Sequence, residues 1–172
     1  LLSTQTASNS ATISFTSDIT SKYREYIFKL YNINPATDAV DISFQANASG
    51  ESGYNESIVS TRFQAYNYES GGSPALAYDT GNDQVGTSFQ TLTNDGGNGG
   101  DESGCGELHL FNPSSTTYVK HFYAQFISYH NENLVNHEFT AGYFNLTEAL
   151  TNIQFKMSSG AFDGKIKMWG VK

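Results

Sequence analysis

Tyrosines with polar neighbours are the residues of this sequence best suited to recognition chemistry. Five of them stand at the ends of expected strands or inside loops: Tyr54, Tyr66, Tyr68, Tyr78 and Tyr129. Amide and carboxylate residues lie beside them, and aromatic rings in such company suit a sugar or a contact between subunits. The residues that we predict to bind a ligand are Tyr66, Tyr68, Tyr78, Tyr129 and His130. The alternative is that several of these rings only cap the edges of a β-sandwich.

The four histidines are the next candidates, because imidazole is a common metal ligand. They are His109, His121, His130 and His137. The first two lie in expected strands, where a partly buried, hydrogen-bonded ring is the simpler role. The other two flank the polar segment 131–136, and Glu132 or Glu138 would have to complete a metal site there. Because no motif sets the separation of these groups, we expect neither a metal nor a cofactor.

An acidic, glycine-rich loop at residues 95–102 suggests calcium binding at first sight. Its segment 96–101 matches the opening of a nonapeptide calcium repeat, but Ser103 stands where the repeat requires an apolar residue, and the motif occurs once. Gly97 and Gly99 occupy positions where an EF-hand loop needs oxygen ligands. We therefore predict a flexible, solvent-exposed loop without a bound ion.

The motifs of several enzyme classes are absent from the chain. It lacks the Gly-x-Ser-x-Gly nucleophile elbow, the His-Glu-x-x-His zinc helix, the Gly-x-x-x-x-Gly-Lys phosphate loop and a dinucleotide fingerprint after a strand. We expect no enzymatic activity. The alternative is a jelly-roll hydrolase that uses Asp79, Asp83 or Glu132 as acid and base, which would require two carboxylates about 5 to 10 Å apart in a cleft.

Charge and composition exclude further classes of function. The chain has 172 residues, with nine Lys and Arg against 17 Asp and Glu, and a net charge of −8. Such a surface repels phosphates and anionic lipids, so we expect no nucleic-acid partner. No segment approaches the ~20 consecutive apolar residues of a membrane helix, so we expect no membrane insertion. The sequence begins without methionine, and we expect a fragment or processed product of a longer chain.

Apolar and polar residues alternate with a period of two along most of the chain, which is typical of strands with one buried face. The expected strands are 11–16, 24–33, 40–46, 58–66, 85–92, 106–111, 117–129, 137–145, 151–157 and 165–172. About ten strands separated by turn-forming residues predict one all-β domain over residues 1–172, an antiparallel β-sandwich of jelly-roll-like type. Long loops rich in Gly, Asn and Ser are expected at 66–86 and 93–106.

Two of the expected strands have unusual patterns. Segment 19–30 also fits the apolar stripe of a helix, but its aromatic and β-branched content favours a strand. Segment 118–129 is apolar on both faces, with Phe122 and Phe126 on one face and Tyr123 on the other. Its second face needs cover, either from a long loop of the same chain or from a neighbouring subunit.

Five segments together carry a resemblance to a known family. They are Asn34-Pro35-Ala36-Thr37-Asp38, Phe111-Asn112-Pro113-Ser114-Ser115-Thr116-Thr117, Ala141-Gly142-Tyr143-Phe144-Asn145, Ile153-Gln154-Phe155-Lys156-Met157-Ser158-Ser159-Gly160 and Asp163-Gly164-Lys165-Ile166-Lys167-Met168-Trp169-Gly170-Val171-Lys172. Over nearly its whole length the chain resembles the C-terminal β-sandwich domain of tail-fibre-like and other virion structural proteins of marine tailed bacteriophages. The resemblance implies a structural or adhesive module on a virus particle, assembled as a homotrimer or a larger ring.

The leading hypothesis is therefore a non-enzymatic phage virion surface protein, located on the virion surface or extracellularly. It would be a tail-fibre tip, a head fibre or a capsid decoration that mediates assembly or binds a host glycan. Its expected partners are copies of itself, with a trimer favoured, and other virion proteins. The alternative is a free carbohydrate-binding module of a secreted protein.

Overall fold

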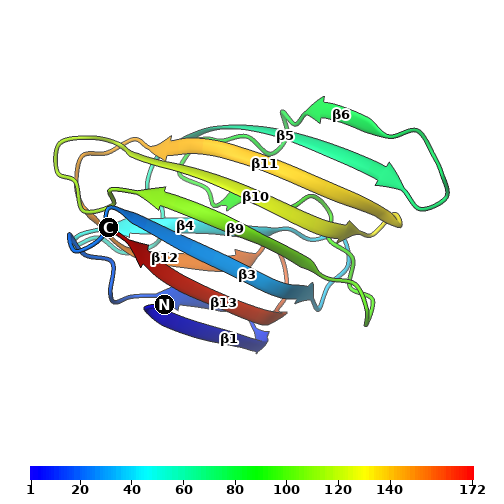
Figure 1. Cartoon of the computed structure of the whole chain (residues 1–172), viewed down its shortest axis with the longest axis horizontal. Helices are drawn as coiled ribbons and strands as arrows, with labels where there is room; N and C mark the ends of the chain where they lie inside the picture. The colour runs from blue at the N-terminus through cyan, green and yellow to red at the C-terminus, as the bar shows by residue number, and fades with distance from the viewer.

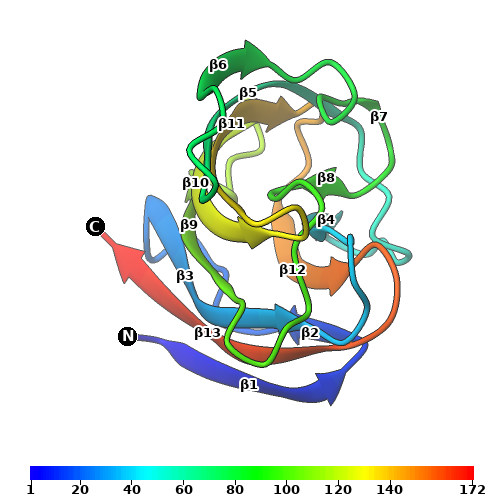
Figure 2. The same cartoon turned by 90° about the vertical axis from the view of Figure 1, so that its right-hand side faces the viewer.

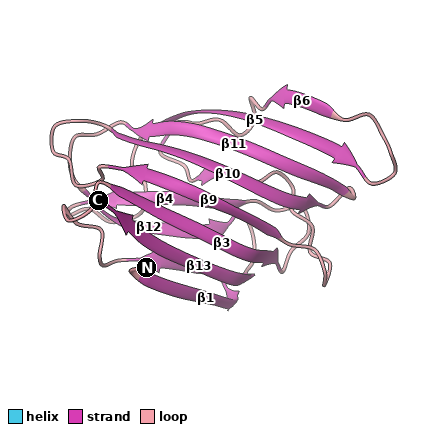
Figure 3. Ribbon diagram, viewed as in Figure 1, coloured by secondary structure: helices cyan, strands magenta, loops and turns pink.

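Thirteen β-strands and no helix form the chain in the computed structural model, which describes residues 1–172 (Figures 1 and 3). A nine-stranded sheet contains β1 (Ser3–Ser10), β3 (Glu25–Pro35), β5 (Ile58–Tyr68), β6 (Ala75–Tyr78), β7 (Val85–Gly86), β9 (Gly104–Phe111), β10 (Lys120–His130), β11 (Leu134–Phe144) and β13 (Phe162–Val171). A four-stranded sheet contains β2 (Thr12–Phe15), β4 (Ile42–Ala48), β8 (Gln90–Thr91) and β12 (Leu150–Met157). The predicted all-β antiparallel fold is confirmed, while the jelly-roll connectivity stays a prediction. With strands alone, the structure offers no helix of the length and apolar character needed to span a membrane.

The two sheets face each other as a sandwich, and the larger sheet curls around the smaller one (Figure 2). The large sheet has the order β1-β13-β3-β9-β10-β11-β5-β6, with β7 also paired to β5, and the small sheet has the order β2-β12-β4-β8. Between them lies a core of 27 buried apolar residues. The Phe44 ring of β4 meets the Phe122 ring of β10 edge-on, with their centroids 5.1 Å apart. Burial of such rings between the sheets supplies much of the driving force for folding.

Strand β10 shows how the alternation divides the large sheet into an inner and an outer face. Phe122, Ala124 and Phe126 point inward and are buried, whereas Tyr123 and Ile127 point outward and remain 38% and 51% exposed. We call the outward side of the nine-stranded sheet the outer face, and on β10 its side chains remain open to solvent. Cover by a loop of the same chain is therefore wrong for this strand, and cover by a neighbouring subunit stays a prediction.

Most expected strands are present, but one is divided. Segment 24–33 forms strand β3, as its composition predicts, and does not form a helix. The segment expected as one strand at 85–92 instead contributes β7 to the large sheet and β8 to the small sheet. The chain crosses between the layers in this segment, because β7 pairs with β5 and β8 pairs with β4. Local alternation does not reveal such a crossing.

Two edge strands were not predicted from the sequence. Strand β1 consists of Ser, Thr, Gln, Asn and Ala, and it lies at one edge of the large sheet. Strand β6 lies at the opposite edge, inside the segment expected as a loop at 66–86. An edge strand has one hydrogen-bonded neighbour and few buried side chains, so its hydrophobic pattern is weak.

The glycine-rich loop is not fully exposed, contrary to the prediction for residues 95–102. Gly96 and Gly97 are buried, and the structure ties their backbone to both layers. The Gly96 N–H donates to the carbonyl of Val40 at 3.0 Å, just before β4, and the Gly97 N–H donates to the carbonyl of Tyr129 on β10 at 3.0 Å. A Cβ at Gly96 would lie 3.1 Å from the carbonyl oxygen of Val40, so glycine favours this close approach of the loop to the chain before β4. The loop thus closes one end of the sandwich.

Candidate ligand-binding site

A hollow of about 280 Å³ opens at the end of the sandwich where β5 and β10 finish and β11 begins, on the right in Figure 1. We call it the end hollow. Its lining consists of Gln64, Tyr66, Tyr68, Asn94, Asp95, His130, Glu132, Leu134 and Asn136. Three of the five residues predicted to bind a ligand, Tyr66, Tyr68 and His130, therefore meet in one place.

Strand parity and register bring these side chains together. Tyr66 and Tyr68 are two residues apart on β5 and point to the same side, with their rings edge to face at a centroid separation of 5.8 Å. Across the strand pair, Tyr66 lies opposite Asn136 and Tyr68 lies opposite Leu134. His130 lies opposite Leu134 on the other side of β11. Three adjacent strands thus form one wall of the hollow.

The opposite wall comes from the loop that closes the sandwich. The carbonyl of Asp95 accepts a hydrogen bond from the N–H of Asn131 at 2.9 Å, which joins the loop to the β10–β11 turn. The His130 Nδ1 accepts the N–H of Glu132 at 3.1 Å, and its Nε2 lies 3.9 Å from Asp95 Oδ2. Because Nδ1 is an acceptor, the neutral imidazole carries its proton on Nε2, where it faces the carboxylate.

Asn136 presents an unused hydrogen-bonding group beside the hollow. Its side chain is 1% exposed, and its Nδ2 donates to Gln64 Oε1 at 3.0 Å. Its Oδ1 is buried and accepts no hydrogen bond from the protein. An unpaired buried acceptor costs about 1 to 3 kcal/mol, so this oxygen is a local energetic cost in the wall of the hollow.

A buried network of ionisable side chains lies behind the hollow. The Arg62 and Glu138 side chains are fully buried, with Arg62 Nη2 3.7 Å from Glu138 Oε1 and Arg62 Nη1 3.5 Å from Asp79 Oδ2. Burial raises the pKa of Glu138 to about 8, although the nearby guanidinium opposes the shift. Glu138 Oε1 also accepts the backbone N–H of Asn94 at 3.1 Å, so the network holds the loop wall of the hollow in position.

Sequence reasoning missed this network as a unit. Arg62 lies on the same inward face of β5 as Ile58. A charged residue at a position expected to be buried was a signal in the sequence that could have indicated the network. Glu138 was weighed only as a metal ligand beside His137, but the two residues point to opposite faces of β11. The structure contains no group of three or more His, Cys, Asp or Glu side chains arranged to hold a metal ion.

The two remaining predicted residues lie outside the end hollow. Tyr129 lines a separate hollow of about 390 Å³ on the outer face, and Tyr68 borders both hollows. Tyr78 lies on β6 opposite Phe63, also on the outer face, and its hydroxyl donates to Asp83 Oδ2 at 2.8 Å. Tyr129 therefore lies next to the end hollow, with Tyr68 between them, whereas Tyr78 lines neither hollow.

The carboxylates considered for a hydrolase have separate surroundings. Asp79 is next to the buried Arg62, Asp83 accepts the hydroxyl of Tyr78, and Glu132 lines the end hollow. What gathers in the end hollow is a pair of tyrosine rings with amide, imidazole and carboxylate groups around them. Such a lining combines an apolar platform with donors and acceptors for hydroxyl groups.

In comparisons with known proteins, no family model and no curated protein matches this chain. The geometry of the end hollow is therefore the basis on which a function is assigned.

Proposed function

We propose that this protein is a non-enzymatic surface module of a bacteriophage virion that binds a host glycan in the end hollow. Its location would be a tail-fibre tip, a head fibre or a capsid decoration. The observation that carries the glycan proposal is the convergence of Tyr66, Tyr68 and His130 with amide and carboxylate groups in one open hollow. The virion location rests on the sequence resemblance described above.

The chemistry of the end hollow supports a sugar as the ligand. Tyr66 and Tyr68 supply apolar ring surface for the C–H face of a pyranose, while Gln64 and Asn94 supply amide groups for its hydroxyls. A volume of about 280 Å³ is sufficient for about one or two sugar rings.

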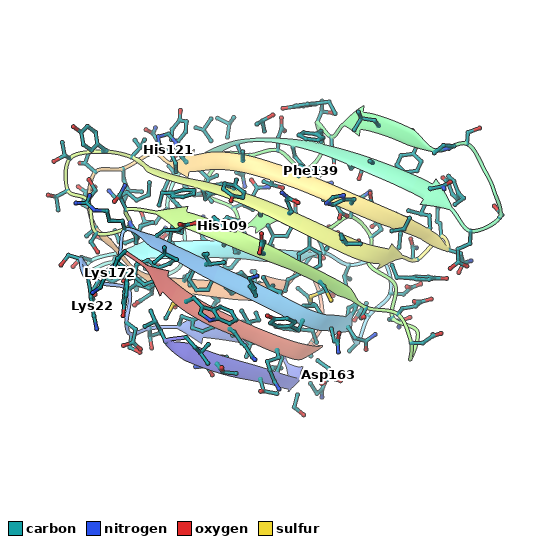
Figure 4. All side chains as sticks on the ribbon, in the orientation of Figure 1. Lys22, His109, His121, Phe139, Asp163 and Lys172 are labelled. Carbon is teal, nitrogen blue, oxygen red and sulfur yellow. The ribbon has the colours of Figure 1, made fainter.

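The outer face supports assembly into an oligomer. Nine of the eleven exposed large hydrophobic side chains lie on it: Tyr31, Phe63, Leu76, Tyr78, Val85, Tyr123, Ile127, Val135 and Val171. Figure 4 shows this face toward the viewer, with His109, His121 and Phe139 labelled on it. Large exposed apolar surfaces of this kind favour contacts between subunits. We propose a homo-oligomer, with a trimer favoured, that uses the part of this face formed by β5, β6, β7, β10 and β11 and leaves the edge formed by β1, β13 and β3 free.

A glycan array probed with the full chain tests the binding proposal. We expect a defined set of glycans to bind, and we expect Tyr66→Ala to abolish that binding without a large change in melting temperature, because the ring is only partly buried. Tyr78→Ala is the matched control, since it removes the same ring on the outer face. Absence of any bound glycan, or equal loss in both variants, would overturn the proposal. Binding by a free monomer would favour a carbohydrate-binding module over a virion component.

A further inference from the structure

A second hollow, larger than the end hollow, lies on a different part of the large sheet. It measures about 550 Å³ and lies on the outer face where β1, β13 and β3 run side by side, at the lower right of Figure 1. We call it the bulge hollow. Its lining consists of Thr6, Ala7, Ser8, Tyr31, Asn32, Asp163, Gly164, Lys165 and Lys167. Strand β9 separates β3 from β10, the nearest strand that lines the end hollow, and the two hollows share no residue.

The pairing of neighbouring strands is irregular beside this hollow. The register shifts in the β1–β13, β13–β3 and β3–β9 pairings, and the three shifts lie side by side across the sheet. Strands β1, β13 and β3 each also contain a residue with positive φ: Asn9 at 47°, Gly164 at 144° and Asn32 at 49°. A Cβ at Gly164 would lie 2.7 Å from Ile33 Cδ1, so the strands approach too closely for a larger residue. Bulges and left-handed residues strain the backbone, and they concentrate at functional sites.

The charge of this hollow is opposite to that of the chain. Lys165 and Lys167 both line it, and neither belongs to any of the ion pairs of the protein. The Lys167 ammonium lies 5.6 Å from the centre of the Tyr31 ring. The one carboxylate of the hollow, Asp163, accepts the backbone N–H of Asn9 at 2.7 Å. Two unpaired ammonium groups therefore stand together in a protein of net charge −8.

The groups around the two lysines indicate the class of ligand. The Tyr31 ring is 39% exposed and offers a flat apolar surface next to the ammonium groups. Thr6, Ser8 and Asn32 add hydroxyl and amide groups for hydrogen bonding. A sugar ring stacks on an aromatic face, and its acidic substituent pairs with ammonium groups. We propose that the bulge hollow is a second saccharide subsite, specific for a sugar residue that carries a carboxylate or sulfate group.

Titration of the full chain with defined oligosaccharides tests this subsite. The probes are an oligogalacturonide, a sulfated galactan oligosaccharide and a neutral galactan oligosaccharide of equal length. We expect at least one acidic probe to bind, the neutral probe to bind more weakly, and added salt to weaken the acidic complex. The two acidic probes distinguish carboxylate from sulfate recognition.

Charge-neutral variants locate the binding. Lys165→Gln combined with Lys167→Gln is expected to lower the affinity for the acidic probe about tenfold, because two exposed ion pairs are lost. Lys22→Gln combined with Lys172→Gln is the matched control, since both lysines are exposed, lie outside the hollow and change the net charge equally. Melting temperatures confirm that both double variants are folded.

Three results would overturn the proposal: equal affinity for acidic and neutral probes, absence of binding by either acidic probe, or equal losses in the two double variants. The last result would mean that only the overall charge matters. The outcome is independent of the end hollow, because Tyr66→Ala is expected to leave binding of the acidic probe unchanged. The proposal for one site can therefore be refuted while the proposal for the other stands.

Discussion

The buried carboxyl of Glu138 is expected to make this protein less stable as the pH rises from acid to mildly alkaline conditions. The side chain is 1% exposed, and burial raises its pKa from 4.5 to about 8. The folded state therefore holds this proton more tightly than the unfolded chain does. The resulting stabilisation is fully present below the unfolded pKa of 4.5, and it is lost as the pH rises through about 8.

The size of the change in the free energy of unfolding follows from the pKa shift of Glu138. Between about pH 5 and about pH 8 the native state binds close to one more proton at this site than the unfolded chain, so the free energy of unfolding falls by about 3 kcal/mol. Asp41, whose pKa burial also raises, contributes in the same direction. Glu138→Gln isolates the first effect, because the amide oxygen still accepts the N–H of Asn94 and the hydroxyl of Ser128 but carries no titrating proton.

Urea unfolding followed by the fluorescence of Trp169, the single tryptophan, measures the effect at a series of pH values. We expect the free energy of unfolding of Glu138→Gln to rise relative to that of the wild type by about 3 kcal/mol between about pH 5 and about pH 8. Glu51→Gln, which alters an exposed loop carboxyl, is expected to retain the wild-type slope. A slope in Glu138→Gln as steep as that of the wild type would refute the reasoning, since Arg62 would then keep the carboxylate ionised throughout.

Two further predictions concern the sheets. Light scattering is expected to find an oligomer that survives dilution and that Ile127→Asp, on the outer face, dissociates; a monodisperse wild-type monomer would contradict assembly through this face. Gly142→Ala is expected to destabilise the protein by about 1 to 3 kcal/mol, because the new Cβ would lie 2.9 Å from Ser60 Cα and closer still to a neighbouring carbonyl. Gly100→Ala adds a methyl group in open space and is the control in thermal unfolding; equal shifts would show that close packing is not the cause.

Part of the site could be predicted from the sequence because its residues lie close together along strands. Tyr66 and Tyr68 share a face of one strand by the period of two, and their chemistry suggested a ligand. His130 joins them because β11 lies between β5 and β10, which the sequence did not reveal. Tyr78 has the same chemistry but lies on the outer face, since its pairing with Phe63 decides its orientation.

Alternation of apolar and polar residues was enough to determine the all-β class and most strands, because it reports which side of a strand is buried. It could not determine the partner of each strand, the closure of one end by the loop around Gly96, or the burial of Arg62 beside Glu138. Those features arise from contacts between segments far apart in the chain. The same is true of the bulges that lie side by side at Gly164 and in the neighbouring strands. A local pattern contains no record of such contacts, so only the tertiary structure decided them.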